Sequence, residues 1–304
     1  MKFAEMFGRT TSRWIKYSEY EANQSKSGEW YISPAPDATS AVYDPIENIE
    51  TVIVDALNIG LKCMSGAKQF YDDNRMVAEM CVFAEKYGLL GLMTALPTTT
   101  GFMEYETVYL PKNRFIRAEA MPSTEYVKLF FPFDDEVNKN PNRYRHYTKD
   151  DSSLMVSLAA RNKPKAIEMS YQRGYSESYK WLRTQFADWA LMFGASFLYY
   201  ELEKTDPELA ALQREAIAAF EGNVPSFHLE LFDKPTIVWD FKSLMTLINV
   251  VFGLMLTDDA RPLRSCKYCN RAFIATHPKA EFCEHKCKNK YNVYKSRAKN
   301  DNDE

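Results

Sequence analysis

The sequence predicts an α+β fold that is mainly helical, with a few short strands and a small cysteine-rich module at the C-terminus. Three observations support this prediction. Long segments repeat apolar residues at helical spacing, two adjacent short segments have the pattern of a β-hairpin, and four of the six cysteines lie between residues 266 and 287. With 304 residues, 46% of them hydrophobic, the chain has enough apolar material for a large core.

Composition divides the chain into three parts. Residues 1–46 are aromatic and polar and contain breaking prolines, so we expect an irregular N-terminal arm with one short helix near Ser12–Tyr20. Residues 47–260 are expected to form a mainly helical domain whose role the sequence does not indicate. Residues 261–304 hold the clustered cysteines and end in a basic segment, which we expect to be a helix.

Helical periodicity is strongest in the central part of the chain. The single cysteines Cys63 and Cys81 lie inside two of these segments, and a lone cysteine in an apolar helix is usually a small buried hydrophobe. The segment 244–256 is strongly apolar but shorter than the roughly 18 residues that a membrane span requires, so we interpret it as a buried core helix. The predicted helices cover residues 46–64, 75–93, 176–203, 207–220 and 243–257.

Strand patterns are shorter. Residues 104–110 and 125–131 are aromatic or alternating runs that predict strands, and residues 226–232 and 235–241 predict a hairpin around Asp233 and Lys234. Residues 134–151 are polar and predict a solvated loop. The alternative reading of that loop is an addition to a phosphate-binding surface, through Lys139, Arg143, Arg145, His146 and Lys149.

The N-terminus lacks an apolar core followed by a small-residue cleavage site, so we expect no secretory signal and a cytoplasmic location. In that compartment thiols stay reduced, and closely spaced cysteines are more often metal ligands or catalytic groups than disulfides. Disulfides therefore become a minor alternative to a metal site.

The formal net charge of −3 hides a strong asymmetry. The segment 261–299 contains two acids, Glu281 and Glu284, and eleven basic residues, so it carries about +9 while the remainder carries about −12. The basic residues are Arg261, Arg264, Lys267, Arg271, Lys279, Lys286, Lys288, Lys290, Lys295, Arg297 and Lys299. The cysteine-rich end is therefore also the cationic end.

The cysteine spacing predicts one structural zinc ion held by Cys266, Cys269, Cys283 and Cys287. A gap of two residues lets the first pair point at one centre, and an i, i+4 spacing puts the second pair on one face of a helix. Four protein ligands close the coordination sphere, whereas catalytic zinc normally keeps one position open. His277 and His285 are substitute ligands, but we prefer the four cysteines because His285 points away from the shared helix face.

A helical wheel started at Cys283 gives the last segment an inward stripe and an exposed remainder. The stripe contains Cys283, Cys287, Tyr291, Tyr294 and Ala298, with two rows of cations on its flanks and small polar residues opposite. If the module binds nucleic acid, the contacting residues are Lys286, Lys288, Asn289, Lys290, Asn292, Lys295, Arg297 and Lys299.

These residues resemble a known family. The run Leu263-Arg264-x-Cys266…Cys269-x3-Phe273…Phe282-Cys283…Cys287-Lys288-Asn289-Lys290, ending in YKSRAK after an apolar helix, resembles the CGNR-type, treble-clef-like zinc fingers of bacterial proteins regarded as transcription regulators. The resemblance covers about 35 residues, and it implies a mostly helical N-terminal domain with a C-terminal DNA-binding finger. The larger part of the chain resembles an uncharacterised bacterial family, which implies no activity.

Three function classes follow. The leading hypothesis is a zinc-binding protein whose finger binds nucleic acid, DNA rather than RNA, in the manner of a transcription regulator. The alternative is a structural zinc module for protein interaction or assembly, including a homo-oligomer. An enzyme within residues 47–257 is the third class, and we leave it open although the chain has none of the short catalytic motifs and no catalytic residue stands out.

Overall fold

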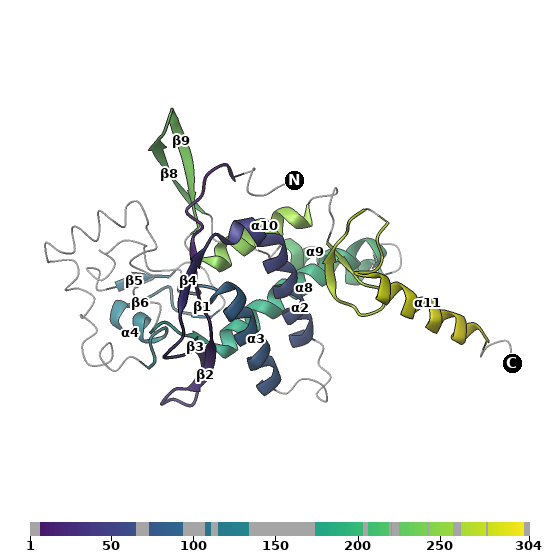
Figure 1. The fold of residues 1–304 in the computed structure, drawn as a ribbon, viewed down its shortest axis with the longest axis horizontal. Helices are drawn as coiled ribbons and strands as arrows, with labels where there is room; N and C mark the ends of the chain where they lie inside the picture. The colour runs from purple at the N-terminus through teal and green to yellow at the C-terminus, as the bar shows by residue number, and fades with distance from the viewer. Residues whose placement is uncertain are drawn as a thin grey trace, which may run out of the picture.

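A computed structural model describes residues 7–64, 73–93, 107–110, 115–133, 174–202, 206–218, 220, 225–241, 243–257, 263–277 and 279–300. Helices dominate these residues and short antiparallel strands accompany them (Figure 1). The 134–151 loop and the first residues of the predicted strand at 104–110 lie outside the described part.

The N-terminal residues contain four strands instead of the expected irregular arm. Strand β1 (Trp14–Tyr17) pairs with β4 (Ser40–Tyr43), and β2 (Tyr20–Gln24) pairs with β3 (Trp30–Pro34), which also pairs with β7 (Glu177–Ser178). The short helix expected near Ser12–Tyr20 is wrong, because aromatic and β-branched residues favour the pleated surface of a sheet. The prolines stand at strand ends or outside strands, where they remove no ladder bond.

The centre of the molecule is a group of packed helices. A short 3-10 turn, η1 (Pro45–Asn48), leads into α2 (Ile49–Met64), followed by α3 (Asp73–Tyr87), α8 (Tyr179–Leu202), α9 (Pro207–Ala218) and α10 (Leu244–Leu256). These helices confirm the predicted helical segments. Residues of the N-terminal strands, including Trp14, Ile15 and Ile32, are buried in the same hydrophobic cluster as the helices.

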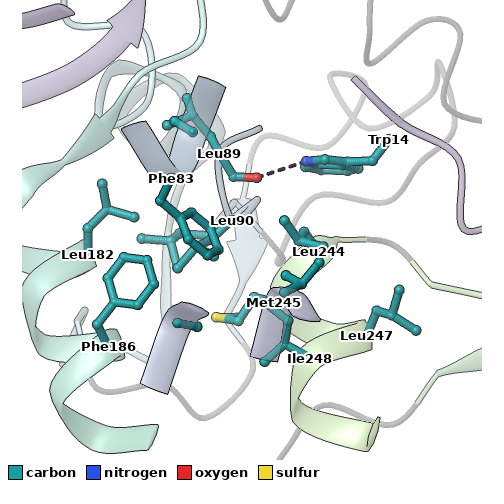
Figure 2. Close-up of a cluster of buried hydrophobic side chains, with 14 of the residues drawn as sticks. Trp14, Phe83, Leu89, Leu90, Leu182, Phe186, Leu244, Met245, Leu247 and Ile248 are labelled. Atoms are coloured by element: carbon teal, nitrogen blue, oxygen red, sulfur yellow. Dashed lines mark hydrogen bonds between the residues drawn. The ribbon is translucent and has the colours of Figure 1, made fainter. Parts of the chain in front are cut away.

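Figure 2 shows how this core joins distant segments. The ring centroids of Phe83 in α3 and Phe186 in α8 lie 5.1 Å apart. Leu90, from the segment after α3, and Met245, from α10, lie beside them (Figure 2). The indole N–H of Trp14 donates to the carbonyl of Leu89 at 2.8 Å. This hydrogen bond ties the chain after α3 to strand β1, across a sequence separation of 75 residues.

Two glycines determine the crossing of α2 with α8 and the end of α3. At Gly60 of α2, an added Cβ would lie 1.9 Å from the carbonyl oxygen of Phe186, so only glycine lets α2 cross α8 at this distance. Gly88 has a φ of +83°, which ends α3 at Tyr87, six residues before the predicted end.

A buried carboxylate fastens the segment after α3. Glu177 is fully buried, and its two oxygens accept the backbone N–H groups of Leu90 at 2.9 Å and Leu92 at 2.7 Å, as well as the Tyr175 hydroxyl at 2.6 Å. Burial raises the pKa of Glu177, although these hydrogen bonds partly oppose that shift. The structure gives Glu177 a clear packing role, because it fixes the path of an otherwise loop-like segment.

One predicted strand is wrong. Residues 107–109 form β5 (Thr107–Tyr109), which pairs with β6 (Ala120–Pro122), but the run at 125–131 contains α4 (Ser123–Lys128) and a turn. Its buried residues are Tyr126, Val127, Phe130 and Phe131, which recur at helical rather than alternating spacing.

The apolar segment at 244–256 is confirmed as a buried helix. Its buried face joins the core, and the side-chain oxygen of Asn249 accepts the indole N–H of Trp189 at 2.7 Å. Within the described residues, none of the helices combines the length and apolarity that crossing a membrane would take.

Two small hairpins lie at the edges of the molecule (Figure 1). The first is the predicted hairpin, formed by β8 (Ser226–Leu231) and β9 (Pro235–Asp240). The second is formed by β10 (Leu263–Ser265) and β11 (Ala272–Ile274) and is followed by α11 (His285–Asn300), which extends away from the helical body.

Candidate metal centre

The first two cysteines lie on the tight turn between β10 and β11. The Cys266 N–H donates to the Arg271 carbonyl at 2.9 Å, and the Asn270 N–H donates to the Cys266 carbonyl at 2.9 Å. Asn270 has a φ of 56°, a left-handed conformation that asparagine tolerates better than most side chains. The sequence therefore builds a knuckle that turns the thiols of Cys266 and Cys269 to one side.

The second two cysteines flank the start of α11. The helix begins at His285, so Cys283 precedes it and Cys287 lies in its first turn. This start is two residues later than the helical wheel assumed. The Lys267 N–H donates to the Glu281 carbonyl at 3.0 Å, which ties the knuckle to the segment that leads into the helix.

The fold brings the four sulfur atoms together. The Sγ–Sγ distances are 3.7 Å for Cys269–Cys283, 3.6 Å for Cys283–Cys287 and 3.8 Å for Cys269–Cys287. With Cys266 included, all four sulfurs lie within 4.8 Å of one another. Cys266 and Cys287 are buried, and the other two are partly buried.

These distances fit a tetrahedral metal site. A Zn–S bond of about 2.3 Å gives a tetrahedron with sulfur–sulfur edges of about 3.8 Å. A disulfide would need about 2.05 Å, and all six cysteines of the chain are free thiols. The cluster can therefore hold a metal ion, and its soft sulfur donors suit zinc.

The electrostatics of the cluster favour a cation. Burial favours the neutral thiol at Cys266, but backbone N–H donors of Cys269 and Cys283 outweigh it and lower its pKa to about 6. At Cys283, burial and hydrogen bonds to the other three sulfurs raise the pKa well above that of an ordinary thiol. Several thiolates cannot share this small space without a compensating positive charge, which a divalent ion supplies.

The remaining candidate ligands lie elsewhere. His277 and His285 are both exposed, and the Nδ1 atom of His277 accepts the Lys279 N–H at 3.1 Å. Neither imidazole belongs to the cluster of sulfurs. Cys63 and Cys81 are partly buried, and burial raises the pKa of each to about 11, which leaves them protonated and unreactive at neutral pH.

A buried amide on α2 anchors the knuckle to the helical body. The side chain of Asn58 donates to the Ala272 carbonyl at 3.1 Å and accepts the Ala272 N–H at 2.9 Å. Leu263 and Ala272 also belong to the main hydrophobic cluster. The cysteine module is therefore packed onto the body. Sequence reasoning missed Asn58, whose signal was one amide among the apolar residues of a predicted helix.

The predicted inward stripe of α11 holds only for its first turns. Cys287 is buried and Tyr291 is partly buried against Phe282, with ring centroids 5.2 Å apart. Tyr294 stacks on Tyr268 of the knuckle at 6.1 Å but is 59% exposed. The stripe is less buried towards the C-terminus because the helix extends beyond the small module. The side chain of Ala298 lies outside the described part.

The predicted nucleic-acid contacts on α11 are exposed wherever their side chains are described. The helix contains six lysines or arginines and no acid. Within the described residues, no carboxylate forms an ion pair with Lys286, Lys288, Lys290, Lys295 or Arg297, whereas Lys267 of the knuckle pairs with Glu281 at 2.6 Å. Asn289 and Asn292 are also exposed, and the side chain of Lys299 is outside the described part.

A groove of about 300 Å³ lies between α2 and α3 beside Arg271. Its carboxylates are both paired with lysines, Asp55 with Lys86 at 3.3 Å and Glu79 with Lys62 at 2.6 Å. Asp55 also accepts the hydroxyl of Tyr87 at 2.9 Å. These contacts join the two helices, and they define no reaction class.

Comparison with known proteins gives no relative. No protein-family model matches the chain, and no curated protein or solved structure matches it significantly. The resemblance to CGNR-type fingers stays a prediction that rests on the residues that suggested it.

Proposed function

We propose that the chain binds one structural zinc ion through Cys266, Cys269, Cys283 and Cys287 in a treble-clef-like module, and that this module binds nucleic acid. The sulfur–sulfur distances support the metal site. Four thiolate ligands would leave no open position for a substrate, so zinc would supply folding energy and hold α11 against the knuckle.

The observation that carries the nucleic-acid proposal is the uncompensated charge of α11. The helix extends from the body (Figure 1), and it contains six cations and no acid. An α-helix fits the major groove of DNA, and lysine and arginine on its flanks would neutralise phosphates. Exposed Asn289 and Asn292 each offer an amide N–H donor and an amide oxygen acceptor, which match the N7 acceptor and the N6 donor that adenine presents in that groove. A transcription-regulator-like protein that binds DNA rather than RNA is the form we favour.

The test is a binding titration of the full chain with duplex DNA and with RNA at increasing salt. If the five described cations of α11 each meet one phosphate, the slope of log K against log salt is about −4.5, a loss of several hundred-fold between 50 and 200 mM salt. Chelation of the metal should abolish this binding, because α11 would lose its attachment.

Charge-matched variants give the control. Replacement of Lys286, Lys290 and Arg297 by glutamate should abolish binding, whereas the same change at exposed Lys128, Lys180 and Lys234 should leave most of it. An equal loss of binding affinity in both variants would contradict the nucleic-acid proposal. A full chain that binds neither DNA nor RNA even at low salt would contradict it as well. Recovery of a protein partner that depends on the α11 cations would then favour the assembly module.

A further inference from the structure

The β8–β9 hairpin has an unusual distribution of side chains. Its register places Phe227, Leu229 and Leu231 opposite Trp239, Ile237 and Pro235 on one face. Because alternate residues of a strand point to the same side, this face is entirely apolar. The other face holds His228, Glu230, Thr236, Val238 and Asp240.

The apolar face is the exposed one. Leu231 is 80% exposed, Leu229 66%, Phe227 59% and Ile237 47%, whereas Val238 on the opposite face is buried. The polar face contacts the N-terminal segment, where the Thr11 hydroxyl donates to the Asp240 carboxylate at 2.8 Å. The usual arrangement of a surface hairpin, apolar inward and polar outward, is thus reversed.

The hairpin is also held rigidly at one end. The Thr11 N–H donates to the Trp239 carbonyl at 2.9 Å, the Trp239 N–H donates to the Arg9 carbonyl at 3.0 Å, and Phe7 packs edge-on against Trp239 at 6.3 Å. Beyond this base the strands extend from the body, on a different side from α11 (Figure 1). A partner can therefore reach the apolar face without displacing the helices.

We infer that this face is the contact between two copies of the chain. A two-fold interface places a surface against itself, where like charges would repel, and this face carries no charge. Five apolar side chains of this face are exposed: Phe227, Leu229, Leu231, Pro235 and Ile237. Roughly 100 Å² from each gives about 500 Å² per copy, so two copies bury about 1,000 Å², the lower bound for a specific interface. The association requires neither the metal nor nucleic acid, so it stands apart from the function proposed above.

The test is the mass of the full chain, with its metal, by sedimentation or light scattering over a range of concentrations. The mass should rise from the monomer value of 35.2 kDa towards twice that value. Hydrogen exchange of residues 226–240 should slow as the concentration rises, which locates the contact. A chain that stays monomeric at several hundred micromolar would overturn the inference.

Matched variants separate this face from general stickiness. Leu229→Glu with Leu231→Glu should give a monomer of unchanged circular dichroism, because both side chains already face solvent. Val42→Glu with Leu212→Glu replaces apolar residues that are 50% and 62% exposed elsewhere and should leave the dimer intact. A dimer that persists in the hairpin variant, or dissociates equally in the control, would overturn the inference.

Discussion

Two of the small hairpins that the structure describes, β10–β11 and β8–β9, are anchored to the body by different contacts. A two-stranded hairpin alone is marginal in water, so each needs a further anchor. The β10–β11 hairpin has four clustered sulfurs and the Asn58 amide. The β8–β9 hairpin has hydrogen bonds to the N-terminal segment and the Phe7–Trp239 contact. The first hairpin is expected to depend on a metal, and the second on ordinary packing.

This difference explains what each region can do. The sulfur cluster lets the chain hold a long cationic helix in place with few buried apolar residues. Among the α11 residues whose side chains are described, Cys287 is the only buried one. The β8–β9 hairpin leaves its apolar residues outside, where they are free to meet a partner. Removing one anchor at a time should therefore affect one region and spare the other.

The largest effect should come from the metal. The purified chain should contain about one zinc ion, and replacing Cys266 and Cys287 by serine should remove it, with loss of amide protection throughout residues 263–300. Zinc contributes about 10–16 kcal/mol of apparent binding energy to the folding of small fingers. Metal analysis and hydrogen exchange measure both, and the β8–β9 hairpin should be unchanged.

Cysteines outside the cluster provide the control for that result. Cys63→Ser and Cys81→Ser, and likewise His277→Ala and His285→Ala, should retain full zinc. A cobalt-substituted chain should show the absorption of cobalt–thiolate bonds only while the four clustered cysteines are intact. Zinc that survives the double serine replacement, or thiols found oxidised to disulfides, would refute the four-cysteine site.

An intermediate effect should come from Asn58. Asn58→Ala leaves the buried N–H and C=O of Ala272 without their side-chain partner, at a cost of about 1–3 kcal/mol for each unsatisfied group. The melting temperature should fall by several degrees, and zinc should pass to a chelator about ten-fold faster or more, because the knuckle loosens. Chelator competition measures the second effect.

Asn249→Ala is the matched control for Asn58. It removes a buried amide whose oxygen accepts the Trp189 N–H in the helical body, so it should also lower the melting temperature. Because Asn249 makes no contact with the knuckle among its described hydrogen bonds, the rate of zinc release should stay unchanged. Equal acceleration of zinc release in both variants would show that Asn58 acts only through general stability.

The two hairpins also differ in how far the sequence could predict them. Cysteine spacing reports directly on sulfur geometry, because two short gaps leave few ways to place four thiols, and helical periodicity located α2, α8 and α10. The strands at residues 14–43 were missed. The β1–β4 pairing joins residues as far apart as Trp14 and Tyr43, and the local β2–β3 hairpin, like β1, depends on packing against α3. Asn58 and the outward apolar face of β8–β9 were also missed, because one amide and one strand pattern do not reveal which side faces the body.

The smallest effect should come from the polar face of the β8–β9 hairpin. His228 lies between two carboxylates, with Nε2 3.0 Å from Glu230 and Nδ1 2.9 Å from Asp240. Hydrogen bonds to Glu230 and then to Asp240 raise the pKa of His228 above its usual value of about 6.5. A raised pKa means that the protonated imidazole stabilises the folded hairpin. This stabilisation is fully present below about pH 6.5 and is lost as the pH rises through the folded value.

Hydrogen exchange of residues 226–240, corrected for the intrinsic rate, should therefore be slower near pH 6 than near pH 8, by no more than a few-fold because the site is partly exposed. An NMR titration of the His228 ring should give its pKa directly. Glu230→Gln should bring that pKa back towards the ordinary value and flatten the pH dependence of exchange, whereas the exchange of residues 263–300 should not respond to this substitution. A pKa of His228 at or below about 6.5 in the unaltered chain would show that the two carboxylates do not hold the hairpin in this way.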